Sequence, residues 1–256
     1  MQLFYRSFGE GEPLIILHGL YGISDNWVTQ AKDLASSYKV FIPDMRNHGQ
    51  SGHSSVFNYD AMVADISEFI DTHELENPVI LGHSMGGKVA MKFTLENPDM
   101  VSNLIVVDVS MRQYHYREYH LKLMSAMRSI DFTKVQSRKD VEELLTSSIE
   151  DVRTRLFIMK NLYWTERKSL SWRINIATIM DNIDYVFEGV SSSTIFDKPA
   201  LFVRGAESDY VIDSDFAQIY HNFPQADIKT IEGAAHWVQA DQPEAFMQAM
   251  KYFLNL

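Results

Sequence analysis

The residues best suited to chemistry in this sequence surround Ser84. Gly82 and Gly86 flank this serine in a G-x-S-x-G pattern, directly after the apolar run 79–81. The pattern predicts a short buried strand, a sharp turn with the serine at its tip and the start of a helix, because glycines on either side let strand and helix pass closely. The N–H groups and positive dipole end of such a helix suit an oxyanion. The pattern therefore favours a serine nucleophile over an ordinary glycine-rich turn.

A serine hydroxyl is a poor nucleophile until a base takes its proton, and the sequence has nine histidines to choose from. Only His236 follows a late strand-like run, and the small residues 233–235 before it leave room for an imidazole. His18 and His83 adjoin predicted loops, and the others lie in polar loops, late in helices or in the middle of the chain. We therefore predict that His236 is the general base.

The elements that must position these residues alternate between strands and helices. This alternation with short loops predicts an α/β fold with a doubly wound, mostly parallel sheet. In such sheets the functional site lies at the carboxyl ends of the strands. Five useful segments follow predicted strands and are expected at that edge: Ser84, Asp108, His236, the pair 18–19 and the loop 44–46.

The segment 111–195 differs from the rest of the chain. Strand-like runs vanish there, helical periodicity dominates, and aromatic and Met residues are frequent. It carries 13 basic and 11 acidic residues, whereas the remainder carries 10 and 23. We predict a core made of 1–110 and 196–256, with 111–195 inserted between its strands as a helical cap whose apolar side chains suit an acyl group.

Composition narrows the classes of partner. A net charge of −11 over 256 residues argues against nucleic acid and against an anionic membrane surface. The absence of cysteine excludes a thiol nucleophile and thiolate metal ligands, and no H-E-x-x-H pattern is present, so we expect no metal and no cofactor. Neither a signal-peptide pattern nor an apolar run of about 18 residues is found, and we expect a cytoplasmic protein. The oligomeric state stays open.

Four motifs, spread over the whole chain, resemble the α/β-hydrolase superfamily. They are His18-Gly19, the loop D-M-R-N-H-G-Q-S at 44–51, G-H-S-M-G-G-K at 82–88 and G-A-A-H-W at 233–237. They are most similar to a branch of small bacterial esterases that hydrolyse short acyl esters and acyl-CoA thioesters. The sharp turn at Ser84 makes the backbone N–H of the next residue, Met85, one donor of an oxyanion hole. The resemblance implies that the backbone N–H of Leu20 is the other donor.

The acid is where the sequence departs from the pattern of the superfamily. The usual place is a Gly-x-x-Asp loop after the strand at 201–203, but here Ser208 stands at that position and Asp209 comes one residue late. Some members place the acid after the preceding strand, where Asp108 stands. One carboxylate must bond the imidazole N–H and stabilise the imidazolium. We favour Asp108 and keep Asp209 as the alternative.

These residues predict a two-step acyl transfer to Ser84 from a small-molecule ester of a short to medium acyl chain. The alternative enzymes are an acyl-CoA thioesterase, a carbon–carbon bond hydrolase and a perhydrolase. A non-catalytic binding module on the same fold is the alternative from another class. Asp44, Arg46 and His48 also lie near the site, and we expect them to tie loops together rather than to bind substrate.

Overall fold

A computed structural model describes residues 1–256, and a seven-stranded sheet forms its centre. The strand order is β1-β3-β2-β4-β5-β8-β9, and only β1 runs antiparallel to its neighbour. The strands are β1 Tyr5–Phe8, β2 Glu12–Leu17, β3 Tyr38–Pro43, β4 Val79–His83, β5 Leu104–Val107, β8 Ala200–Gly205 and β9 Ala226–Ile231. The predicted doubly wound, mostly parallel sheet is confirmed.

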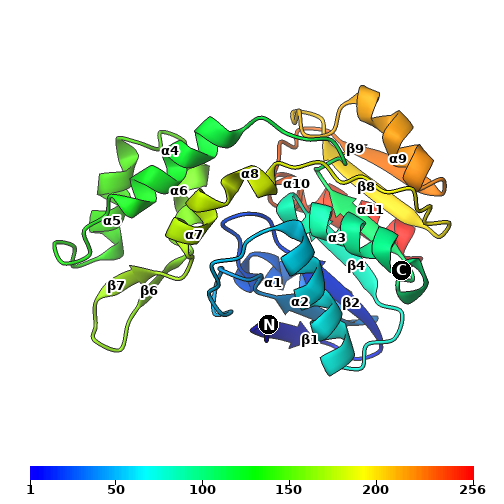
Figure 1. Cartoon of the computed structure of the whole chain (residues 1–256), viewed down its shortest axis with the longest axis horizontal. Coiled ribbons are helices and arrows are strands. Elements are labelled where there is room, and N and C mark those ends of the chain that lie inside the picture. The colour runs from blue at the N-terminus through cyan, green and yellow to red at the C-terminus, as the bar shows by residue number, and fades with distance from the viewer.

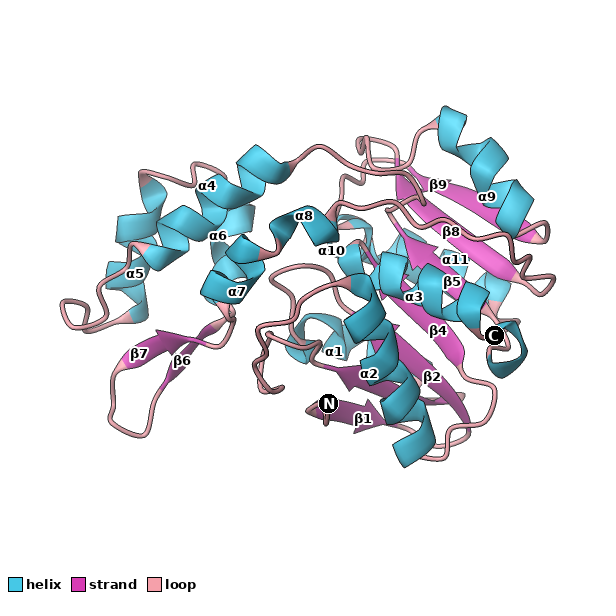
Figure 2. Cartoon of the chain, viewed as in Figure 1, coloured by secondary structure: helices cyan, strands magenta, loops and turns pink.

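Helices cover both faces of the sheet (Figure 2). They are α1 Val28–Leu34, α2 Tyr59–Thr72, α3 Met85–Glu96, α9 Phe216–Asn222, α10 Val238–Asp241 and α11 Pro243–Phe253, with single 3-10 turns at Ser24–Trp27, Pro98–Met100 and Asp213–Asp215. Alternate residues of a strand face opposite sides. In β2, Ile15 packs in the cluster that includes α2 and α3, whereas Ile16 packs in the cluster that includes α1 and α11. This two-sided burial explains why the central strands are continuous apolar runs.

The segment 111–195 lies to one side of the sheet, and most of its regular structure is helical (Figure 1). Its elements are α4 Arg117–Arg128, α5 Arg138–Thr146, α6 Val152–Met159, β6 Leu162–Trp164, β7 Leu170–Trp172, α7 Ile176–Asp181 and α8 Ile183–Val186. The antiparallel hairpin β6–β7 was not predicted, because three-residue strands are too short to display an alternating pattern. The larger apolar cluster continues from the sheet into this segment through Met124, Met127 and Ile158. None of the helices is both long and apolar enough to cross a membrane.

Candidate active site

Ser84 occupies the turn between β4 and α3 in a strained backbone conformation. Its φ of 53° and ψ of −121° lie outside the regions that a non-glycine residue normally adopts. A Cβ on Gly82 would overlap the carbonyl oxygen of Gly86, and a Cβ on Gly86 would overlap that of Leu17. Both glycines of the predicted pattern are therefore required by the close approach of strand, turn and helix.

His236 lies in the loop between β9 and α10 and contacts both predicted partners. Its Nε2 is 3.0 Å from Oγ of Ser84, and its Nδ1 is 2.8 Å from Oδ2 of Asp108. Because a carboxylate only accepts, Nδ1 carries the proton and Nε2 is free to take the serine proton. The imidazole stacks on the ring of Tyr210 with centroids 3.7 Å apart and an interplanar angle of 19°.

Asp108 follows β5 directly and is fully buried. Its Oδ1 accepts a 3.0 Å hydrogen bond from the backbone N–H of Gly205. Its Oδ2 accepts a 2.5 Å hydrogen bond from the hydroxyl of Ser208 besides the bond from His236. Three donors therefore hold this carboxylate in place, as a buried charge requires.

Asp209, the alternative acid, points elsewhere. It is exposed, and its backbone carbonyl accepts a 2.6 Å hydrogen bond from the guanidinium of Arg112. The structure brings Asp108, and not Asp209, to the imidazole. Ser208 and Tyr210 were not identified from the sequence as site residues. For Ser208 a signal existed, since it stands where the usual loop has its aspartate, but nothing in the sequence singles out Tyr210.

The two predicted oxyanion donors, Leu20 and Met85, both border a small recess beside Ser84. Met85 is the first residue of α3. The backbone N–H groups in the first turn of a helix have no carbonyl acceptor within that helix. The backbone N–H of Leu20 makes no hydrogen bond within the chain. The geometry is compatible with the predicted role of both groups, which remains a prediction.

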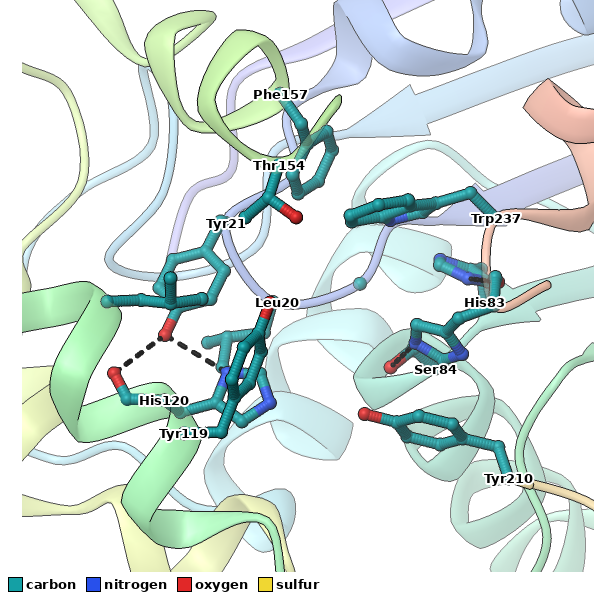
Figure 3. A pocket seen from close by; sticks show the side chains of 13 residues that line it. Leu20, Tyr21, His83, Ser84, Tyr119, His120, Thr154, Phe157, Tyr210 and Trp237 are labelled. Atoms are coloured by element: carbon teal, nitrogen blue, oxygen red, sulfur yellow. Dashed lines mark hydrogen bonds between the residues drawn. The ribbon is translucent and has the colours of Figure 1, made fainter. Parts of the chain in front are cut away.

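A cavity of about 240 Å³ opens onto Ser84 and His236. Figure 3 shows the hydroxyl of Tyr210 pointing into it from one side and Phe157 and Trp237 bordering it on another. The segment 111–195 contributes the following lining residues: Tyr119, His120, Leu123, Thr154 and Phe157. The core and the inserted segment together thus form the walls of the cavity, and most of them are apolar or aromatic.

The loop residues that we expected to be structural do tie loops together. Arg46 donates two hydrogen bonds, of 2.6 and 2.7 Å, to the carboxylate of Asp65, which is fully buried on α2. Asp44 accepts from the backbone N–H groups of Ser24 at 2.6 Å and Gln50 at 2.8 Å. These contacts fix the loops that surround the site without reaching into the cavity.

Two buried histidines support the loop that carries Leu20. Nε2 of His18 accepts a 2.9 Å hydrogen bond from the N–H of Met45, and Nε2 of His48 accepts a 3.2 Å bond from the N–H of Tyr21. Burial lowers the pKa of His18 to about 4 and that of His48 to about 3, so both rings are neutral acceptors at neutral pH. No group of three or more His, Asp or Glu side chains is arranged to hold a metal ion.

Comparisons with known proteins agree with this architecture. Residues 12–243 match the family described as alpha/beta hydrolase fold. A solved structure titled "Marine microorganism esterase" superposes with a TM-score of 0.95 at 42% identity, over 98% of this chain and 99% of that one. The esterase YbfF of Escherichia coli (strain K12) is 31% identical over 95% of this chain and 93% of its own length. The sn-1-specific diacylglycerol lipase ABHD11 of Danio rerio is 34% identical over 96% of this chain and 80% of its own length. The chain therefore belongs to the alpha/beta hydrolase fold family.

Proposed function

We propose that Ser84, His236 and Asp108 form the catalytic triad of a carboxylic ester hydrolase, the activity that the family and its named esterase and lipase relatives support. The observation that carries the proposal is the unbroken chain from Ser84 Oγ through both imidazole nitrogens to Asp108. This arrangement matches the order of groups that activates a serine for acyl transfer.

In the proposed reaction, Ser84 Oγ attacks the carbonyl carbon of the ester while its proton passes to Nε2 of His236. Asp108 stabilises the resulting imidazolium through Nδ1–H. The bond to the leaving group then breaks, and the alcohol departs with the proton from His236. Water then attacks the acyl-enzyme and gives a proton to Nε2 of His236. His236 returns this proton to Ser84 Oγ as the acyl bond breaks, which releases the carboxylic acid and the free serine.

The developing oxyanion is assigned to the backbone N–H groups of Leu20 and Met85. Met85 begins the helix next to Ser84 and the N–H of Leu20 has no acceptor within the chain, and both observations support this assignment. Preorganised donors of this kind typically contribute about 10²–10³ in rate each. We further propose that 111–195 acts as a cap, since it supplies one wall of the cavity at the nucleophile.

The proposed substrate is a small-molecule ester of a short to medium acyl chain. The apolar and aromatic side chains around Ser84, in the cavity and in the small recess beside it, support this choice. An acyl-CoA thioester is the alternative, because a thiolate leaves by the same steps. A groove that shares Phe157 and Trp237 with the cavity is lined by Lys160 and by the ion pair of Arg153 and Asp241, whose atoms are 2.9 Å apart. The positive charge of Lys160 is the reason to test an anionic leaving group.

The experiment compares initial rates of the wild type and Ser84→Ala on p-nitrophenyl acetate, butyrate and octanoate and on the matching acyl-CoAs. We expect turnover of at least one series that Ser84→Ala lowers by at least about 10³-fold. A fluorophosphonate should label the wild type stoichiometrically and leave Ser84→Ala unlabelled. Absence of both turnover and labelling would instead support a binding module. Labelling without turnover of any ester or thioester would favour a carbon–carbon bond hydrolase or a perhydrolase.

A further inference from the structure

Helix α3 carries a buried lysine, Lys88, four residues after Ser84. This lysine is 1% exposed and pairs with no carboxylate. Its Nζ donates a 2.7 Å hydrogen bond to the backbone carbonyl of Arg112 and another to that of Glu188, and it lies 4.7 Å from the centre of the Tyr114 ring. A buried amine with neutral partners is costly and needs an explanation.

The two carbonyls belong to the two connections between the core and the segment 111–195. The connections also pair with each other. The N–H of Tyr114 donates to the carbonyl of Phe187 at 2.9 Å, and that of Val190 donates to the carbonyl of Met111 at 2.8 Å. Lys88 therefore joins the incoming and the outgoing connection to the helix that begins at the nucleophile.

A hydroxyl from α2 contributes to the same junction. Tyr59, which is 5% exposed, donates a 2.6 Å hydrogen bond to the carbonyl of Val186. Tyr59 and Lys88 thus hold the end of α8 and the outgoing connection to the core, at Val186 and Glu188.

Residues at both connections also line the recess beside Ser84. Its lining includes Ser84 and Met85, Lys88 itself, and Tyr114, Val186 and Phe187 from the segment 111–195. Its volume is about 20 Å³, which is room for one group the size of water or methyl. The position of these backbone segments therefore determines how long a group fits beside the nucleophile.

We propose that the acyl group enters this recess while the leaving group of the ester lies in the larger cavity, and that Lys88 is a positioning residue. By holding both cap connections against the recess, Lys88 limits the acyl group at Ser84 to a short chain. The proposal rests on the ester hydrolase function proposed above and names the part of the molecule that selects the acyl length. Lys88 does not itself bind the acyl group, because its donors are already directed at the two carbonyls and the face of Tyr114.

The ionisation of Lys88 agrees with a structural amine. Burial, together with the nearby charge of Arg112, lowers its pKa to about 7. A neutral amine still donates two N–H bonds, so the clamp persists on both sides of neutral pH while the cost of burying a charge falls.

The test measures kcat/KM for p-nitrophenyl acetate, butyrate and octanoate in Lys88→Met, a change that keeps the length of the side chain and removes its donors. Lys92→Met is the matched control, because Lys92 is one turn further along α3 and pairs only with Asp60 and Glu96. We expect the wild type to prefer acetate, and the octanoate-to-acetate ratio to rise about tenfold in Lys88→Met and to stay unchanged in Lys92→Met. Val186→Ala, which widens the recess directly, should move the ratio in the same direction.

Three results would overturn the proposal. They are a wild type that prefers octanoate, a loss of the same factor for all three esters in Lys88→Met, and a response of Val186→Ala without one of Lys88→Met. If Lys88→Met does not fold, Tyr59→Phe tests the same junction by removing one hydroxyl, and a ratio within twofold of the wild type then counts against the clamp.

Amide hydrogen exchange separates this proposal from the proposed function. Exchange in 111–114 and 187–190 should accelerate at least about tenfold in Lys88→Met and remain unchanged in Lys92→Met. Faster exchange in a protein with no Ser84-dependent turnover would mean that the clamp exists and the assigned reaction is wrong. Unchanged exchange in an active Lys88→Met enzyme would mean that the assigned reaction is right and that Lys88 does not hold the connections.

Discussion

The hydroxyl of Ser208 donates a 2.5 Å hydrogen bond to Oδ2 of Asp108, the same oxygen that accepts from His236. The serine stands in the loop where the superfamily usually has its acid, and its side chain turns toward the carboxylate that we propose as the acid of the triad. We expect Ser208→Ala to lower kcat/KM for p-nitrophenyl butyrate about tenfold to a hundredfold, because a hydrogen bond to a charged group contributes about 1.5–3 kcal/mol. An unchanged rate would mean that the bond from Gly205 alone positions the carboxylate.

The choice between the two candidate acids makes the sharpest prediction. Asp108→Asn should lower kcat about 10³–10⁴-fold, because the imidazole loses the carboxylate that orients it and stabilises its charged form. Asp209→Asn should stay within about threefold of the wild type, since this side chain is exposed and has no contact with His236. Initial rates of both variants on one ester distinguish the two candidates. A large loss in Asp209→Asn with little change in Asp108→Asn would mean that Asp209, in the loop after β8, is the acid.

The close packing under the nucleophile predicts a large effect of one methyl group on stability. In Gly86→Ala the new Cβ would overlap the carbonyl oxygen of Leu17, and we expect the free energy of unfolding to fall by about 3 kcal/mol. Gly52→Ala is the control, because the nearest atom to its Cβ would be the flexible end of Met1 at 3.4 Å. Urea unfolding followed by circular dichroism should show a change below about 1 kcal/mol for the control, and equal effects of the two variants would contradict this account.

Buried histidines predict loss of stability in acid. Burial lowers the pKa of His18 and His120 to about 4 and that of His48 and His83 to about 3, from the ordinary value of 6.5. Between pH 6.5 and 4 the unfolded chain therefore binds protons that the folded chain does not. The stabilisation is full above pH 6.5 and falls as the pH drops, by up to about 1.4 kcal/mol per pH unit for each histidine.

Thermal unfolding measured from pH 7.5 to 4.5 tests this effect. The melting temperature should fall steeply below pH 6.5, and His48→Gln should show a shallower slope than the wild type because one proton-binding difference is removed. Parallel slopes for the two proteins would show that His48 does not contribute in the way its burial implies.

The sequence alone was sufficient for the features that depend on local spacing. The glycines around Ser84, the apolar runs of the central strands and the small residues before His236 are local patterns. Each is imposed by sterics within a few residues or by burial on both faces of a sheet. For that reason the fold class could be predicted, and the contact between Ser84 and His236 follows from placing both at the same edge of the sheet.

The tertiary structure decided what depends on residues distant in sequence. Whether Asp108 or Asp209 reaches the imidazole depends on how the end of β5 and the loop after β8 lie beside His236, and a shift of one residue in a tight loop redirects a side chain. The stacking of Tyr210 on His236 and the bonds from Lys88 to both cap connections join segments that no local pattern relates. Such contacts arise only when the chain packs, because long-range neighbours are selected by the shape and polarity of the whole core.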